Sequence, residues 1–278
     1  MAATASSQQG VLGYEVVTLP DDVVSFLVRT VIWAACFGGL HLVVRPVVRW
    51  TALPPKYYGD WVNRVVATGH AIVSSTFGAL VLFAEPPFAE TAVDVVRFRP
   101  VDTVHGTSDR LQYAVPFTLG YFIYDCIVMC VDPAVLMPLM VVHHMVSLLV
   151  WPLSVLSSAG TFYVAYFLFT EVSTPFVHFA IFFLPKHGVE TGIRTIIGWG
   201  MLISFFLVRV VPAPMLFHSL WCSQPYWEDV HPVVKGLAFC TLPLPPFMFL
   251  YWFARMVKGA IKHLSDHPAT EHPAKKLQ

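Results

Sequence analysis

Seven long apolar stretches recur along this chain of 278 residues. They lie at roughly 23–44, 60–83, 111–131, 134–156, 161–184, 193–211 and 233–256. A helix needs about 20 consecutive apolar residues to cross the hydrocarbon core of a bilayer. Lipid offers no hydrogen-bond partners to the backbone, and a helix satisfies its backbone N–H and C=O groups internally. The sequence therefore predicts an all-α integral membrane protein, with about seven transmembrane helices that form one bundle.

The composition agrees with a membrane protein and excludes several other classes. Hydrophobic residues make up 56% of the chain and charged residues 12%, whereas soluble domains carry about 25% charged residues. The formal net charge is zero, so no basic field attracts nucleic acid, and we expect no nucleic-acid partner. The five cysteines are odd in number and include no CxxC pair, which argues against a disulfide framework or a zinc ribbon.

The apolar stretches divide the chain into three parts. Residues 1–59 are expected to hold an N-terminal segment and the first transmembrane helix, residues 60–258 the main domain, and residues 259–278 a disordered tail. Most Lys and Arg residues fall in the first, third and fifth loops and at the C-terminus. The positive-inside rule therefore predicts a cytosolic C-terminus.

Prolines raise two further expectations. The fourth stretch contains Pro138 and Pro152, which leaves a re-entrant segment open there as an alternative to a full span. The seventh stretch carries prolines at 243, 245 and 246. Because proline removes a helical hydrogen bond and clashes with the preceding turn, we expect this stretch to be kinked or broken.

Two adjacent histidines, His143 and His144, lie in the otherwise apolar fourth stretch. Ionisable side chains are costly at membrane depth, so such a pair indicates a functional site. His70, Asp125 and Glu171 lie at a depth similar to that of the pair, and polar residues of the second to fifth stretches fall at helical spacing. They are His70, Tyr121, Asp125, Ser147, Thr170, Glu171, Thr174 and His178. We therefore expect one interior polar site, while hydrogen bonding between helices stays open as a simpler role for these residues.

Three motifs follow one another in an informative order. They are Gly120-Tyr-Phe-Ile-Tyr-Asp125, then His143-His144-Met-Val-Ser147, then Phe169-Thr-Glu-Val-Ser-Thr-Pro-Phe176. This order resembles the TLC (TRAM/Lag1/CLN8) domain family over residues 60–258. Within it, the chain is most similar to the small TLC domain-containing (TLCD) proteins of the transmembrane-protein-56 type.

The resemblance also shows where this chain departs from the catalytic branch of the family. Ceramide synthases carry His-His followed by a His-Asp-Xaa-Ser-Asp segment. At the matching positions here the third His and the last Asp are replaced by Thr170 and Thr174, and an acid persists as Glu171. His143, His144 and Glu171 are therefore the candidate catalytic residues of an incomplete motif.

The resemblance implies a multi-pass protein of the endoplasmic reticulum or another endomembrane that acts in lipid homeostasis. Its interior site would bind or sense a membrane lipid, such as a sphingolipid or an acyl chain, without a cofactor. One alternative is a ceramide-synthase-like N-acyltransferase with acyl-CoA as co-substrate, and a second is a CLN8-like trafficking or cargo receptor. A metal-dependent hydroxylase would need several His boxes; only one His-His pair is present, so we expect no metal. The sequence indicates no oligomeric state.

Overall fold

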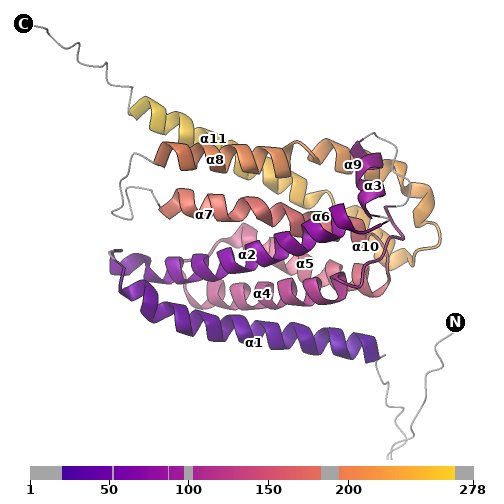
Figure 1. The fold of residues 1–278 in the computed structure, drawn as a ribbon, viewed down its shortest axis with the longest axis horizontal. Helices are drawn as coiled ribbons and strands as arrows, with labels where there is room; N and C mark the ends of the chain where they lie inside the picture. The colour runs from indigo at the N-terminus through magenta and orange to yellow at the C-terminus, as the bar shows by residue number, and fades with distance from the viewer. Residues whose placement is uncertain (1–20, 52, 87, 97–102, 183–193, 267–278) are drawn as a thin grey trace, which may run out of the picture.

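The structure is a computed structural model that describes residues 21–51, 53–86, 88–96, 103–182 and 194–266 (Figure 1). Seven of its helical segments are long and apolar enough to cross a membrane. They are Asp22–Arg49, Pro55–Ala84, Leu111–Val131, Pro138–Leu156, Thr161–Phe182, Thr195–Cys222 and Pro232–Lys262. The predicted fold class, an all-α membrane bundle, is confirmed.

The described elements are all helical and are numbered along the chain. The order is α1 (Asp21–Arg49), η1 (Pro55–Tyr57), α2 (Tyr58–Ala84), α3 (Phe88–Val96), α4 (Leu111–Val131), α5 (Pro138–Leu156), α6 (Thr161–Thr170), η2 (Glu171–Ser173), α7 (Thr174–Phe182), α8 (Arg194–Phe205), η4 (Phe206–Val210), α9 (Ala213–Cys222), η5 (Gln224–Trp227), α10 (Pro232–Thr241) and α11 (Leu244–Asp266).

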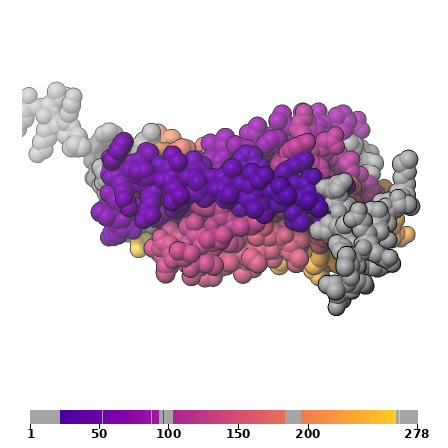
Figure 2. Space-filling model, turned by 90° about the horizontal axis from the view of Figure 1, so that it is seen from below, coloured from indigo at the N-terminus to yellow at the C-terminus, as the bar shows by residue number. Residues whose placement is uncertain are grey.

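Helices α2, α4 and α6 form the interior of the bundle, with α1 along one side and α8 and α11 along the opposite side (Figure 1). Gly78 lets α2 approach α6, since a Cβ atom there would lie 2.4 Å from the backbone nitrogen of Phe169. Gly120 does the same for α4 and α1, because a Cβ atom there would lie 2.9 Å from the carbonyl oxygen of Thr30. Figure 2 shows α1, in indigo, lying along this face of the molecule.

Prolines decide where the spans bend. Pro175 has no N–H to bond the carbonyl of Glu171, and the chain there tightens into the 3₁₀ turn η2 between α6 and α7. The seventh span breaks between Thr241 and Leu244, as predicted. In contrast, α5 is one continuous helix: Pro138 occupies its first turn, where no backbone donor is needed. Its 19 residues are long and apolar enough to cross a membrane, which favours a full span over the re-entrant alternative.

Three boundaries differ from the sequence predictions. The connection between the second and third spans contains α3, an amphipathic helix of nine residues that is too short to appear as an apolar stretch in the sequence. The sixth span continues to Cys222 because Pro212 lies at the start of α9, where proline is tolerated. Helix α11 runs to Asp266, so the first part of the predicted tail is helical. The rest of that tail and residues 1–20 lie outside the described residues.

Candidate functional site

A cavity of about 380 Å³ lies between α2, α4, α5, α7, α8, η4 and α11. Eight of the polar residues singled out in the sequence line it: His70, Tyr121, Asp125, His143, His144, Glu171, Thr174 and His178. The fold thus brings together residues from four consecutive spans. Asn63, Arg209 and the charged residues Asp60, Arg64 and Arg255 line it as well.

Two of the predicted residues point elsewhere. Ser147 faces away from the cavity and donates a hydrogen bond to the carbonyl of His143, 3.0 Å away. Thr170 is buried and donates to the carbonyl of Phe167 at 2.7 Å. Both hydroxyls therefore satisfy the backbone of their own helix.

Asp125 is the carboxylate next to the histidine pair. Its Oδ1 accepts a 2.7 Å hydrogen bond from the side-chain amide of Asn63. Its Oδ2 lies 3.3 Å from Nδ1 of His144, an ion-pair distance at which the ring is not aligned for a hydrogen bond. The His144 ring stacks on Phe122, with 4.3 Å between the ring centroids. His144 is thus a buried imidazole, stacked on Phe122, edge to face with Tyr121 and beside one carboxylate.

His70 is fixed on both sides by its neighbours. Its ring stacks on that of Tyr121 with 3.9 Å between centroids. Its Nε2 lies 2.9 Å from the hydroxyl of Ser74, which is also 2.9 Å from that of Thr118. His178, at the other end of the cavity, shares a 2.7 Å hydrogen bond with Thr68.

Glu171 is paired with Arg209, a residue that the sequence analysis did not assign to the site. The guanidinium donates to Glu171 at 3.2 Å, to Thr174 at 3.1 Å and to Ser173 at 2.9 Å. Thr174 in turn donates to Glu171 at 2.7 Å. Arg209 lies in η4, a π-helical segment of the kind that often occurs at functional sites. It is the only charged residue between positions 195 and 222. A single charge in an apolar stretch indicates a functional residue, and this feature of the sequence could have identified Arg209.

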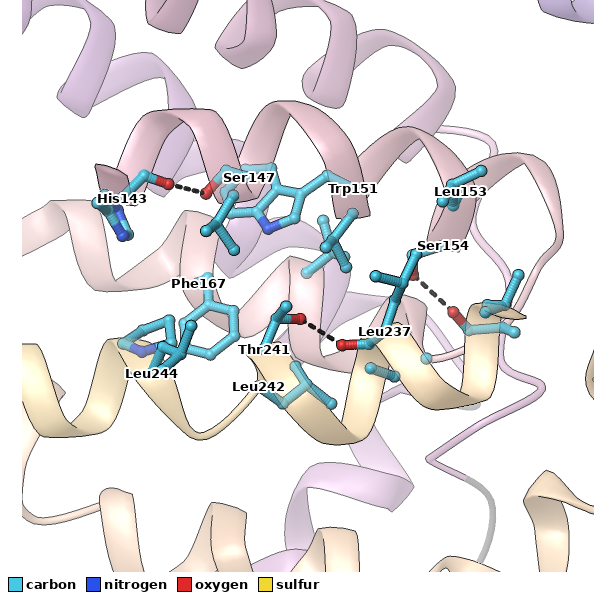
Figure 3. A pocket seen from close by; sticks show the side chains of 18 of the residues that line it. His143, Ser147, Trp151, Leu153, Ser154, Phe167, Leu237, Thr241, Leu242 and Leu244 are labelled. Carbon is cyan, nitrogen blue, oxygen red and sulfur yellow. Dashed lines mark hydrogen bonds between the residues drawn. The ribbon is translucent and has the colours of Figure 1, made fainter. Parts of the chain in front are cut away.

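A second, narrower cavity of about 50 Å³ adjoins the first between α5, α6, α10 and α11; we call it the apolar slot. Figure 3 shows His143, Ser147 and Trp151 of α5 facing Leu237 and Thr241 across it. Along α5 the slot extends from Val142 to Ser154, about 18 Å at the helical rise. That length is close to the hydrocarbon thickness of one leaflet, roughly 15 Å.

His143 lines both cavities. Its ring meets that of Trp252 edge to face, with 6.3 Å between centroids. It stands where the polar cavity and the apolar slot meet. An imidazole there can exchange a hydrogen bond with a bound molecule while that molecule also contacts the slot.

The charged end of the cavity lies where α2 begins, and we call it the mouth. Arg64 and Asp60 form an ion pair there at 2.9 Å. Arg255 of α11 is exposed and donates to the hydroxyl of Tyr251 at 3.1 Å. Within the described ranges, no group of three or more His, Cys, Asp or Glu side chains is placed to hold a metal ion.

Comparison with known proteins agrees with the motif order around the histidine pair. A family model described as the TLC domain matches residues 60–258. The chain is 26% identical over 194 residues to TLC domain-containing protein 4-B of Danio rerio, a match that covers 69% of this chain and 66% of that protein. It is 27% identical over 230 residues to TLC domain-containing protein 4 of Homo sapiens, covering 79% and 80% of the two chains. The match to TLC domain-containing protein 4 A of Dictyostelium discoideum is 22% over 216 residues, or 74% and 76%. With most of its length matched and seven apolar helices in its structure, the chain belongs to the TLC domain family of multi-pass membrane proteins.

Proposed function

We propose that this protein binds a lipid within its helical bundle, with the polar head in the cavity and an acyl chain in the apolar slot. Through this site it acts in lipid homeostasis, in the endoplasmic reticulum or another endomembrane. Membership of the TLC domain family is consistent with a lipid role. The ligand class is a membrane lipid such as a sphingolipid or a fatty acyl compound, and no cofactor is required.

The position of His143 carries the most weight. Its ring lines both the polar cavity and the apolar slot. A lipid is amphipathic, and its polar head and its chain meet at one point. A site for it therefore needs a polar compartment in contact with an apolar one.

The charge of the mouth supports an orientation. Arg64 and Arg255 line the mouth, and Lys258 and Lys262 follow on α11. Basic residues at helix ends favour the cytosolic side. We place the mouth and the C-terminus there, so that the ligand head faces the cytosolic leaflet.

Lipid occupancy of the purified protein tests this function. Substituting Trp for Val146, which lines the slot, fills the space for a chain. The control is Met145→Trp, on the same helix but facing outward with 56% of its surface exposed. Mass spectrometry of lipids retained through detergent purification is expected to find one class of lipid enriched in wild type and Met145→Trp, and depleted about tenfold in Val146→Trp. Equal lipid content in all three proteins would contradict the proposal.

Acyl transfer is a second candidate, favoured by the contact between His144 and Asp125. A carboxylate beside Nδ1 of a histidine orients the ring and stabilises its protonated form, as a general base requires. In such a reaction a lipid amine attacks the thioester carbonyl of acyl-CoA and the carbon–sulfur bond breaks. His144 takes the amine proton and returns it to the departing thiolate, which leaves an amide and free CoA thiol. The imperfect alignment at 3.3 Å is compatible with this role, because such contacts often tighten only when substrate binds.

Microsomes supplied with labelled acyl-CoA and long-chain bases test the second candidate. Amide formation is expected to fall about 10²–10⁴-fold in Asp125→Asn. The control is Asp132→Asn, just beyond the end of the same helix and outside the cavity lining. Absence of amide product with the wild-type protein would remove the acyl-transfer candidate and leave lipid binding in place.

A further inference from the structure

A chain of hydrogen bonds connects α1 to the centre of the cavity. Nδ1 of His41 lies 2.7 Å from the hydroxyl of Tyr124. The Tyr124 hydroxyl donates to the carbonyl oxygen of Asn63 at 3.1 Å, and the Asn63 amide donates to Asp125 at 2.7 Å. We call these four residues the relay. It starts on α1, outside residues 60–258 that the family model matches, and ends at the carboxylate beside His144.

The direction of every hydrogen bond in the relay is fixed. The hydroxyl of Tyr124 has a single hydrogen, which Asn63 receives. The tyrosine oxygen can therefore only accept from His41, whose Nδ1 must carry a proton. Because the carbonyl oxygen of Asn63 is occupied, its NH₂ group is turned toward Asp125. Each donor thus points to the carboxylate.

The relay fixes orientation and does not conduct protons. An amide NH₂ such as that of Asn63 donates hydrogen bonds but does not give up its proton at ordinary pH, so the chain is interrupted there. The Asn63 amide is held against a half-turn at both ends, by Tyr124 at its carbonyl oxygen and by Asp125 at its NH₂ group. That rotation would place a carbonyl oxygen against the Asp125 carboxylate, which is repulsive and leaves both groups unpaired.

The position of α1 is independently secured. Gly120 allows close backbone contact between α4 and α1, and Arg29 donates to the carbonyl of Gln112 at 3.1 Å. The hydrogen bond from His41 to Tyr124 is therefore only one of several contacts that hold this helix in place. The His41 imidazole can be removed without removing the helix.

We propose that His41 is a positioning residue for the proposed lipid site, and that it fixes the Asp125 carboxylate beside His144 through Tyr124 and Asn63. The expected effect of His41 on lipid binding rests on the proposed function, whereas the hydrogen bonds of the relay do not depend on it. Helix α1 thereby becomes part of the site and not only an anchor in the membrane.

Infrared spectroscopy of the purified protein tests the geometry without any ligand. The carboxyl band of Asp125 is the band that disappears in Asp125→Asn. It is expected to shift in His41→Ala and in Tyr124→Phe. In His41→Asn it is expected to return toward its wild-type position, because the asparagine NH₂ lies near the place of the histidine Nδ1 and restores the donor. The control is Thr30→Ala, a buried residue of α1 that bonds only its own helix, and the band is expected to stay unchanged there.

Lipid occupancy of the same variants tests the consequence. It is expected to fall about fivefold in His41→Ala, as for one lost hydrogen bond, and to stay near wild type in His41→Asn and Thr30→Ala. An Asp125 band that does not move in His41→Ala, or that moves equally in Thr30→Ala, would overturn the inference. If the band shifts as expected but wild type retains no lipid, the relay stands and the proposed function fails.

Discussion

Arg209 shows how one side chain organises a membrane interior. It is 6% exposed and lies over the rings of Phe205 and Phe249, 5.3 Å and 4.8 Å from their centroids. Its guanidinium donates hydrogen bonds to Glu171, Ser173 and Thr174. A buried charge must be paired and hydrogen-bonded, and here one cation holds together the turn between α6 and α7.

Replacing Arg209 with Leu is expected to destabilise the protein by about 3–5 kcal/mol, because it leaves the Glu171 carboxylate without its cation. The double variant Arg209→Leu/Glu171→Leu should recover most of that loss, since no charge remains unpaired. Unfolding in mixed detergent micelles measures both. Arg255→Leu, at an exposed position, serves as the control. Equal unfolding curves for Arg209→Leu and Arg255→Leu would show that the pair contributes nothing.

For individual residues, the sequence predicts which polar side chains lie within the membrane-spanning helices, but not all of the residues with which they pair. The helical spacing of His70, Tyr121 and Asp125 correctly predicts that they share a cavity. Ser147 lines the slot and not the cavity, and its hydroxyl bonds the turn before it. The pairing of Glu171 with Arg209 joins residues 38 positions apart, and no local pattern encodes such a contact. Whether these residues bind or catalyse stays a prediction.

The packing of elements depends on a few small residues. Gly78 of α2 lies against α6, and its absent side chain sets how closely the two helices approach. Gly69 lies on the same helix but on an exposed face with no atom near its missing Cβ. Hydropathy predicts the spans that contain α2 and α6, but it assigns the same value to Gly69 and Gly78. The point at which two helices make close contact therefore cannot be predicted from hydropathy.

The two glycines give an element-scale prediction. Gly78→Ala and Gly69→Ala raise helix propensity equally, by about 0.5–1 kcal/mol. Only Gly78→Ala forces a methyl group into the Phe169 backbone, so we expect it to lower stability by about 1–3 kcal/mol. Thermal unfolding of the purified variants decides this, and a stabilised Gly78→Ala would mean that α2 and α6 are not in close contact.

For the molecule as a whole, hydropathy predicts the number and order of the spans, because length and apolarity are properties of each segment alone. The cavity arises from how six of the spans meet, with Pro175 tightening one span at η2 and a break at Pro243 in another. These irregularities place Glu171 and Trp252 on the cavity wall. The prolines predict where each span is interrupted. They do not predict which side chains of the helix beyond the interruption face the cavity.

If all seven apolar helices cross the membrane, the two ends of the chain would lie on opposite sides of it. From the basic residues near the mouth, we expect the C-terminus in the cytosol. An epitope added at the C-terminus should be reached by antibody after selective permeabilisation of the plasma membrane, and one at the N-terminus only after the inner membranes are opened as well. The reverse pattern would place the mouth on the lumenal side.

The central claim is that a lipid lies inside the bundle, and photo-crosslinking tests it most directly. Bifunctional sphingoid-base and fatty-acid probes would be activated in membranes that contain the protein, and the labelled residues mapped by mass spectrometry. Adducts are predicted on residues of the slot and cavity, such as Val146, Leu237 and Met140, and excess unlabelled lipid should suppress them. Adducts confined to the outward-facing side of α1, such as Val31 and Leu42, and insensitive to competitor would contradict the claim.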